Sequence, residues 1–271
     1  MSKVIAIINQ KGGTGKTTTC LNVGVGLAKK GYKVLLLDND PQSSLTVALG
    51  IANSDVLSET LTDYYLKEID SDSDEVSFDI KTYTEKERAI LDYIPSNISL
   101  SGVELSLFNA MNRERILKSF LSKKTKDGVS LLEKYDYILI DCSPSLSMLT
   151  INALSIADEL VIPVQAQYLS AKGLEQLLKT ISKIKKQLNP KLNVLGILFT
   201  MANQRTNEFK EMSSLVQEAY GAKINIFKTI LPMSVKAAES TSRNTSISNY
   251  APNSSIAVAY DSLVDEIMEV R

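Results

Sequence analysis

The chain has 271 residues, of which 44% are hydrophobic and 23% are charged, and its formal net charge is −1. This composition is ordinary for a globular protein with a continuous core, so we expect residues 1–271 to form a single domain. The chain has no histidine, which excludes imidazole as a base or a metal ligand. The first apolar run, residues 4–8, is too short for a signal peptide or a membrane span, and this predicts a cytoplasmic protein.

The predicted elements alternate between short apolar strands and amphipathic helices. In chain order they are a strand at 4–8, a helix at 16–30, strands at 33–38 and 91–94, a charged helix at 112–124, a strand at 135–141, a helix at 147–156, a strand at 159–164, a helix at 171–188, a strand at 192–200, and helices at 207–220 and 254–270. This alternation predicts an α/β fold, a mostly parallel twisted sheet with helices on both faces, and places the active site at the carboxyl ends of the strands.

The charges are distributed unevenly along the chain. Residues 51–100 hold twelve acidic and four basic residues, and the stretch 70–75 within them is expected to be an exposed acidic loop. Residues 171–250 hold twelve basic and five acidic residues, a balance of +7. Solvated helix surfaces and a nucleic-acid footprint are both open explanations of this basic block.

A glycine-rich segment, QKGGTGKTT at 10–18, follows the first strand and opens the first helix. Glycines let successive N–H groups point at phosphate oxygens, and the helix N-terminus favours negative charge. Lys16 is expected to reach the β and γ phosphates of ATP, and the Thr17 hydroxyl to bind Mg²⁺. The standard P-loop pattern has glycine where Gln10 stands. The predicted ATP-binding residues are Lys11, Gly12, Gly13, Thr14, Gly15, Lys16, Thr17 and Thr18.

Three aspartates follow strands near this segment. Asp141 ends an apolar run, as does the aspartate that holds magnesium through water in P-loop enzymes, and Asp38 and Asp40 lie at the end of the second strand. One aspartate at a strand end is often only a turn former. Three around one P-loop indicate a functional cluster. Thr17 is expected to bind Mg²⁺ directly and Asp141 to hold it through water.

The segments KGGTGKTT, LLLDNDPQ and YILIDCSPSL resemble the ParA/Soj family of partition ATPases, which have a deviant Walker A motif. The resemblance spans nearly the whole chain and includes TINAL at 150–154, VIPVQ at 161–165 and TMANQRT at 200–206. It implies an ATP-bound sandwich homodimer in which Lys11 reaches the partner's nucleotide. It also implies that Asp40 positions the attacking water; the alternative role for Asp40 is contact with a magnesium-bound water, a role shared with Asp38. Lys11, Lys16 and Asp40 are therefore the expected catalytic residues, and intrinsic hydrolysis is expected to be slow.

The resemblance also implies the partners. The dimer would bind double-stranded DNA without sequence preference, through basic residues for which Arg205, Lys236 and Arg243 are the candidates, and a ParB-type centromere-binding protein would stimulate hydrolysis. The expected location is the nucleoid. The chain starts at the first strand, which resembles the short members that lack a helix-turn-helix extension.

The sequence departs from the family pattern at two places. LPMSVK at 231–236 stands where I-P-R-N-V-R is common, so Met233 and Lys236 replace arginines. Lysine keeps the positive charge of arginine but cannot bind a phosphate through two parallel N–H groups, which predicts weakened or altered DNA binding. Ser143 stands where the family commonly has proline.

Two other functions on the same fold remain as alternatives. A MinD-like membrane ATPase would need a basic amphipathic C-terminal helix, but residues 260–271 carry four acidic residues and one basic residue, so no membrane partner is expected. An iron–sulfur scaffold ATPase or a nitrogenase-type iron protein would need paired cysteines, but Cys20 and Cys142 form no CxxC motif.

Overall fold

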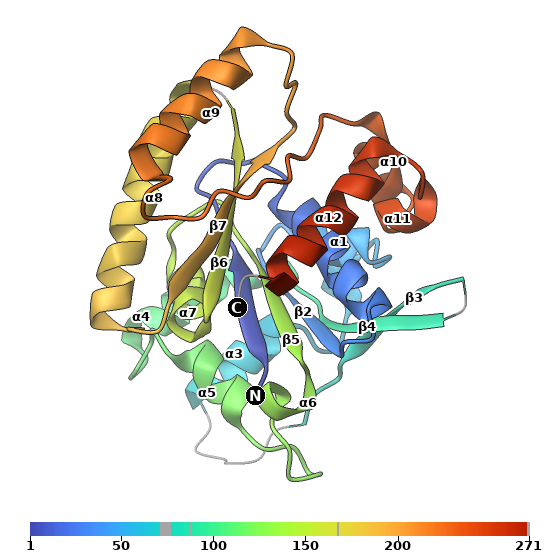
Figure 1. Cartoon of the computed structure of the whole chain (residues 1–271). Helices are drawn as coiled ribbons and strands as arrows, with labels where there is room; N and C mark the ends of the chain where they lie inside the picture. Colours follow the sequence, from blue (N-terminus) through green and yellow to red (C-terminus); the bar gives the residue numbers. More distant parts are fainter. Residues whose placement is uncertain (71–76, 87, 167, 270–271) are drawn as a thin grey trace.

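A seven-stranded sheet forms the centre of the protein in a computed structural model, which describes residues 1–70, 77–86, 88–166 and 168–269 (Figure 1). The strand order is β3-β4-β2-β5-β1-β6-β7, and all neighbours are parallel except β3 and β4. The strands are β1 (Lys3–Ile7), β2 (Val34–Asn39), β3 (Lys81–Glu85), β4 (Arg88–Ile94), β5 (Tyr137–Cys142), β6 (Glu159–Gln165) and β7 (Asn193–Thr200). The predicted fold class, a mostly parallel α/β sheet, is confirmed.

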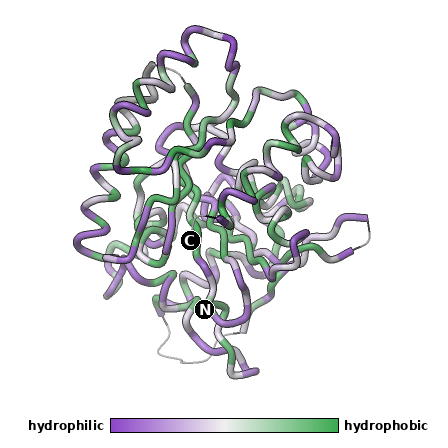
Figure 2. Tube along the Cα trace, viewed as in Figure 1, coloured by the Kyte–Doolittle hydropathy of each residue, from purple (hydrophilic) through white to green (hydrophobic). Residues whose placement is uncertain are grey.

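Helices cover both faces of the sheet. One apolar core packs α3, α4, α5, α7, α8 and α9 against one face, and a second packs α1, α2, α11 and α12 against the other (Figures 1 and 2). The helices are α1 (Lys16–Lys29), α2 (Ser44–Ala48), the 3₁₀ turn η1 (Ser54–Val56), α3 (Leu61–Asp70), α4 (Leu100–Asn109), α5 (Ile116–Ser122), α6 (Leu131–Lys134), α7 (Met148–Ile156), α8 (Tyr168–Gln187), α9 (Asn207–Tyr220), α10 (Val235–Ser242), α11 (Ile247–Tyr250) and α12 (Ser255–Glu269).

Strand β2 shows why the strand sequences are apolar without alternation. Leu35 and Leu37 belong to the first core, whereas Val34 and Leu36 belong to the second. Successive side chains point to opposite faces of a strand, so the part of β2 that is covered on both faces, Val34 to Leu37, is a continuous apolar run.

Helix α1, which follows the glycine-rich segment, is held closely by its neighbours. A Cβ atom on Gly24 would lie 2.7 Å from a Leu36 methyl group of β2, and one on Gly26 would lie 2.6 Å from a Val264 methyl group of α12. The helix ends before Gly31, whose φ of 93° lies in the left-handed region that glycine accepts. This packing fixes the start of α1 relative to the strands.

Most predicted elements are present within one to three residues of their expected bounds. The charged segment 112–124 is shorter than predicted, because Asn112 has a φ of 52° and the helix α5 begins only at Ile116. Strand β3, the turn η1 and helices α2, α3, α4, α6, α10 and α11 were not predicted. Of the predicted acidic loop, residues 71–75 lie outside the described residues, as does Val270 at the end of the last predicted helix.

Both cysteines are buried and free: Cys20 in α1 and Cys142 at the end of β5. Burial raises the pKa of each thiol above its ordinary value. Within the described ranges, no helix combines the length and the apolar character that a membrane crossing requires.

Candidate nucleotide-binding site

The segment 8–15 joins the carboxyl end of β1 to the start of α1. Gly13 and Gly15 have φ values of 70° and 83°. Glycine adopts this left-handed conformation without strain, whereas residues with a side chain do not. Gly15 precedes the first helical residue, and no side chain caps the N-terminus of α1. The first N–H groups of α1 are therefore left without a side-chain cap, as a phosphate-binding helix N-terminus requires.

Three polar side chains that the sequence analysis did not single out brace this loop. Asn9 accepts a hydrogen bond from the Lys11 N–H at 2.9 Å and donates to the Pro163 carbonyl at 2.6 Å. Gln165, the last residue of β6, donates to the Gly13 carbonyl at 2.8 Å, and Thr200, the last residue of β7, donates to the Thr14 carbonyl at 2.8 Å. The signal available in the sequence was a polar residue at the end of each neighbouring strand.

Lys16 is buried inside the loop that precedes it. Its Nζ donates to the Lys11 carbonyl at 3.3 Å, and only 7% of the residue is exposed. Burial lowers the pKa of Lys16, while the carboxylates of Asp141 and Asp40 oppose that effect. A polyphosphate in the loop would supply the negative charge that this desolvated ammonium group lacks.

Thr17 and Asp141 meet beside Lys16. The Thr17 hydroxyl donates to Asp141 Oδ2 at 2.7 Å, and Asp141 Oδ1 is buried without a hydrogen-bond partner among the described residues. Asp141 is paired in register with Asp38 across β5 and β2. Burial first, and the charge of Asp38 second, raise the pKa of Asp141 well above its ordinary value.

This arrangement fits a hydrated Mg²⁺ ion. Buried carboxylates that repel one another are stabilised by a divalent cation, and the unpartnered Asp141 Oδ1 offers an acceptor for a metal-bound water. Within the described part of the chain, no group of three Cys, Asp or Glu side chains could hold a metal directly. The remaining ligands would therefore come from Thr17, phosphate oxygens and water.

Asp38 and Asp40 differ in their surroundings. Asp38 is fully buried, and its Oδ2 accepts from both the N–H and the hydroxyl of Thr46, at 2.8 and 2.6 Å. Burial raises the pKa of Asp38 to about 7, although the bonds from Thr46 oppose that shift. Asp40 is half-buried, and its Oδ1 accepts from the Gln42 N–H at 2.9 Å. Of the two, Asp40 is the carboxylate accessible to water.

Of the three predicted DNA-binding residues, two lie close together and the third lies on another part of the fold. Lys236 and Arg243, at the two ends of α10, both lie over the Tyr250 ring, 5.5 and 5.2 Å from its centroid, and Lys236 also pairs with Glu239. Arg205 precedes α9 in the turn after β7. Helices α8 and α10 lie on opposite sides of the sheet (Figure 1), so the basic block counted along the sequence does not form one surface.

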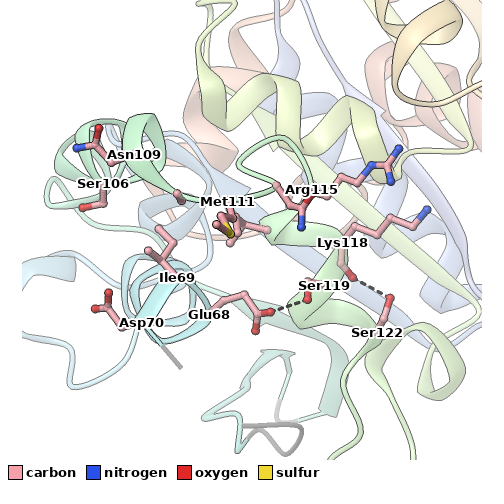
Figure 3. Close-up of a pocket in the computed structure, with 13 residues that line it drawn as sticks. Glu68, Ile69, Asp70, Ser106, Asn109, Met111, Arg115, Lys118, Ser119 and Ser122 are labelled. Carbon is pink, nitrogen blue, oxygen red and sulfur yellow. Dashed lines mark hydrogen bonds between the residues drawn. The ribbon is translucent and has the colours of Figure 1, made fainter. Parts of the chain in front are cut away.

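A separate groove of about 970 Å³ lies among α3, α4 and α5 (Figure 3). Its floor contains a hydrogen bond from Ser119 to Glu68, and Met111, Arg115 and Lys118 line it. None of the predicted site residues borders it.

Comparison with known proteins identifies the family of the chain. The model of the AAA domain matches residues 2–194. The sporulation initiation inhibitor protein Soj of Bacillus subtilis is 41% identical over 98% of both chains, and the chromosome partitioning protein ParA of Caulobacter vibrioides is 35% identical over 98% of this chain and 94% of its own. The chain belongs to the Soj/ParA family of partition ATPases. The prediction made from its P-loop and aspartate motifs is confirmed.

A solved structure carries the same fold with a nucleotide. The crystal structure of cobyrinic acid a,c-diamide synthase from Mycobacterium smegmatis with bound ADP and magnesium is 31% identical, covers 98% of this chain and 93% of its own, and has a TM-score of 0.78.

The two departures from the Soj/ParA pattern lie in different environments. Ser143 is buried, and its hydroxyl lies 3.0 Å from the Ser145 hydroxyl, just before α7. Met233 is 72% exposed and precedes α10. Loss of an arginine at Met233 therefore removes a charge from the protein surface next to Lys236.

Proposed function

We propose that this Soj/ParA protein is an ATP-dependent DNA partition ATPase that acts as one domain, residues 1–271. Its ATP-bound sandwich dimer binds DNA without sequence preference, and a ParB-type centromere-binding partner releases it by stimulating hydrolysis, which drives plasmid or chromosome segregation at the nucleoid. The observation that carries the proposal is the buried group of Lys16, Thr17 and Asp141, with one Asp141 oxygen unpartnered among the described residues, in a chain 41% identical to Soj.

Each residue of the site has a role in this proposal. The N–H groups of residues 12–18 and the Lys16 ammonium group bind the phosphates. Thr17 would hold Mg²⁺ directly, and Asp38 and Asp141 would hold it through water; the ion neutralises phosphate charge when bound. Asp40 orients the attacking water. A single subunit hydrolyses ATP slowly, because the lysine that contacts its nucleotide is Lys11 of the second subunit in the dimer.

Lys11→Ala is expected to leave ATP affinity within about threefold of wild type and to abolish the ATP-dependent dimer. The Lys11 N–H and carbonyl make the loop contacts with Asn9 and Lys16, so the variant keeps the loop and removes only the side chain. Removal of a cation from a desolvated phosphate contact costs about 2–5 kcal/mol, enough to disfavour the dimer. Sedimentation velocity with ATP measures the result.

Lys33→Ala is the matched control, because this exposed lysine precedes β2 at the amino end of the sheet, opposite the loop. It should dimerise as wild type does. An intact ATP dimer of Lys11→Ala would remove the proposed contact with the partner's nucleotide.

Binding of non-specific duplex DNA tests the proposed function. With the hydrolysis-deficient Asp40→Ala protein, we expect binding with ATP, little with ADP or without nucleotide, and weakening as salt rises. Lys236→Ala/Arg243→Ala should weaken binding about tenfold and lower the slope of log K against log salt by about 2, since each lost phosphate contact lowers it by about 0.9.

Lys183→Ala/Lys186→Ala removes the same charge from exposed positions on α8, on the other side of the sheet. This control should match wild type in fluorescence anisotropy. If ATP drives dimerisation but DNA is not bound at low salt, the proposal fails, and if the α8 variant is the weaker binder, the DNA contact lies on α8 and not on α10.

A further inference from the structure

Thr46 and Ser96 lie beneath the turn that carries Asp40. Thr46 belongs to α2, and Ser96 follows β4. Both residues are fully buried, at 0% exposure. Polar groups in such an interior are costly unless each finds a hydrogen-bond partner, so their partners indicate what they hold in place.

The two hydroxyls form one continuous chain of hydrogen bonds. The Thr46 hydroxyl donates to Asp38 Oδ2 at 2.6 Å and accepts from the Ser96 N–H at 2.9 Å. The Ser96 hydroxyl then donates to the Asp40 carbonyl at 2.8 Å. These hydrogen bonds therefore connect Asp38 at the end of β2 with Thr46 in α2, Thr46 with Ser96 after β4, and Ser96 with the Asp40 carbonyl.

The backbone around Asp40 needs this support. Its carbonyl also accepts from the Ser43 N–H at 2.9 Å, and Ser43 has a φ of 55°. A residue other than glycine keeps such a conformation only where its surroundings enforce it. The bond from Ser96 to the Asp40 carbonyl is the contact that ties this turn to a different strand.

We propose that Ser96 and Thr46 are positioning residues for ATP hydrolysis: their hydroxyls hold the Asp40 main chain so that its carboxylate faces the attacking water. This inference rests on the proposed role of Asp40. Neither hydroxyl contacts the loop 10–18 through a hydrogen bond in the described structure. Loss of the Ser96 hydroxyl should therefore affect turnover and not ATP affinity, whereas Thr46 also bonds to Asp38, an expected contact of magnesium-bound water.

Ser96→Ala tests the inference most directly. It removes one oxygen and keeps the Ser96 N–H bonded to Thr46, so the variant is expected to fold. We expect the kcat of ATP hydrolysis to fall about tenfold with Kd for ATP within about twofold, because a small displacement of a catalytic group costs up to about 100-fold. Thr46→Val should also lower kcat, although it removes the bond to Asp38 Oδ2 as well. Thr46→Ser, which keeps the hydroxyl, should turn over as wild type does.

Ser155→Ala is the matched control. Ser155 is also buried and donates to a carbonyl, that of Asn152, at 2.9 Å, but it lies near the end of α7. It should have wild-type kcat with a loss of thermal stability similar to that of Ser96→Ala. An equal loss of turnover in Ser155→Ala would mean that general destabilisation causes the effect, and would overturn the inference.

The variant Ser96→Ala/Asp40→Ala separates the inference from its premise. If Ser96 acts through Asp40, the double variant should turn over no more slowly than Asp40→Ala. A wild-type kcat in Ser96→Ala together with an inactive Asp40→Ala would overturn the positioning role alone. A wild-type kcat in Asp40→Ala would overturn the role of Asp40 and the positioning role with it.

Discussion

Lys16→Ala is expected to abolish measurable ATP binding at concentrations that saturate the wild-type protein. Lys16 is the buried cation of the loop, and its pKa is lowered because burial removes water that the ammonium group would otherwise contact. Loss of a desolvated charge contact with phosphate costs about 3 kcal/mol or more, which corresponds to a decrease in affinity on the order of 100-fold. Isothermal titration calorimetry with Mg²⁺ and ATP measures it.

Lys30→Ala is the control for this variant, because it removes an exposed lysine from the other end of α1, where it pairs with Asp265. It should bind ATP as wild type does. An unchanged affinity in Lys16→Ala would mean that the loop does not hold the phosphates. Thermal unfolding of both variants without nucleotide checks that α1 remains folded.

Asp40→Ala is expected to lower kcat by about 100-fold while the ATP-bound dimer persists, since misplacement of a reacting group costs about 100-fold. Phosphate release under saturating ATP and sedimentation with ATP measure the two effects. The carboxylate also accepts the Gln42 N–H, so the alanine variant loses both a charge and a turn contact.

Asp40→Asn separates these two losses. Asparagine keeps an oxygen that accepts the Gln42 N–H but carries no charge. If orientation of water by the charge is the role of Asp40, Asp40→Asn should be as slow as Asp40→Ala. Recovery of turnover in the asparagine variant would show that Asp40 only shapes the turn.

The strands and the longer helices could be predicted because their sequences carry one clear pattern each. Strands β2 and β5 each begin with an apolar run that ends at an aspartate, Asp38 or Asp141. Helix α9 was predicted at its observed bounds, with Thr206 accepting from the Phe209 N–H at its start. Strand β3, KTYTE, was not predicted because it is an edge strand with exposed polar positions, and its pairing with β4 is a tertiary contact.

The candidate site divides in the same way. Lys16, Thr17 and Asp141 could be predicted because one local motif and one strand end identify them. The braces from Gln165 and Thr200 and the support from Ser96 join residues far apart in the chain. Gln165 follows Gly13 by 152 positions, and Ser96 follows Asp40 by 56 positions. Single polar residues of these types occur throughout the sequence, so only the fold reveals their partners.

The burial of both native thiols has a practical consequence for following the ATP cycle. The thiolate is the form that reacts with maleimide reagents, and burial keeps Cys20 and Cys142 protonated as well as inaccessible. A fluorophore directed at one introduced surface cysteine, for instance in place of Ser242, would therefore label the folded protein at a single position. Energy transfer between two such subunits could then report subunit association in real time without removal of any native residue.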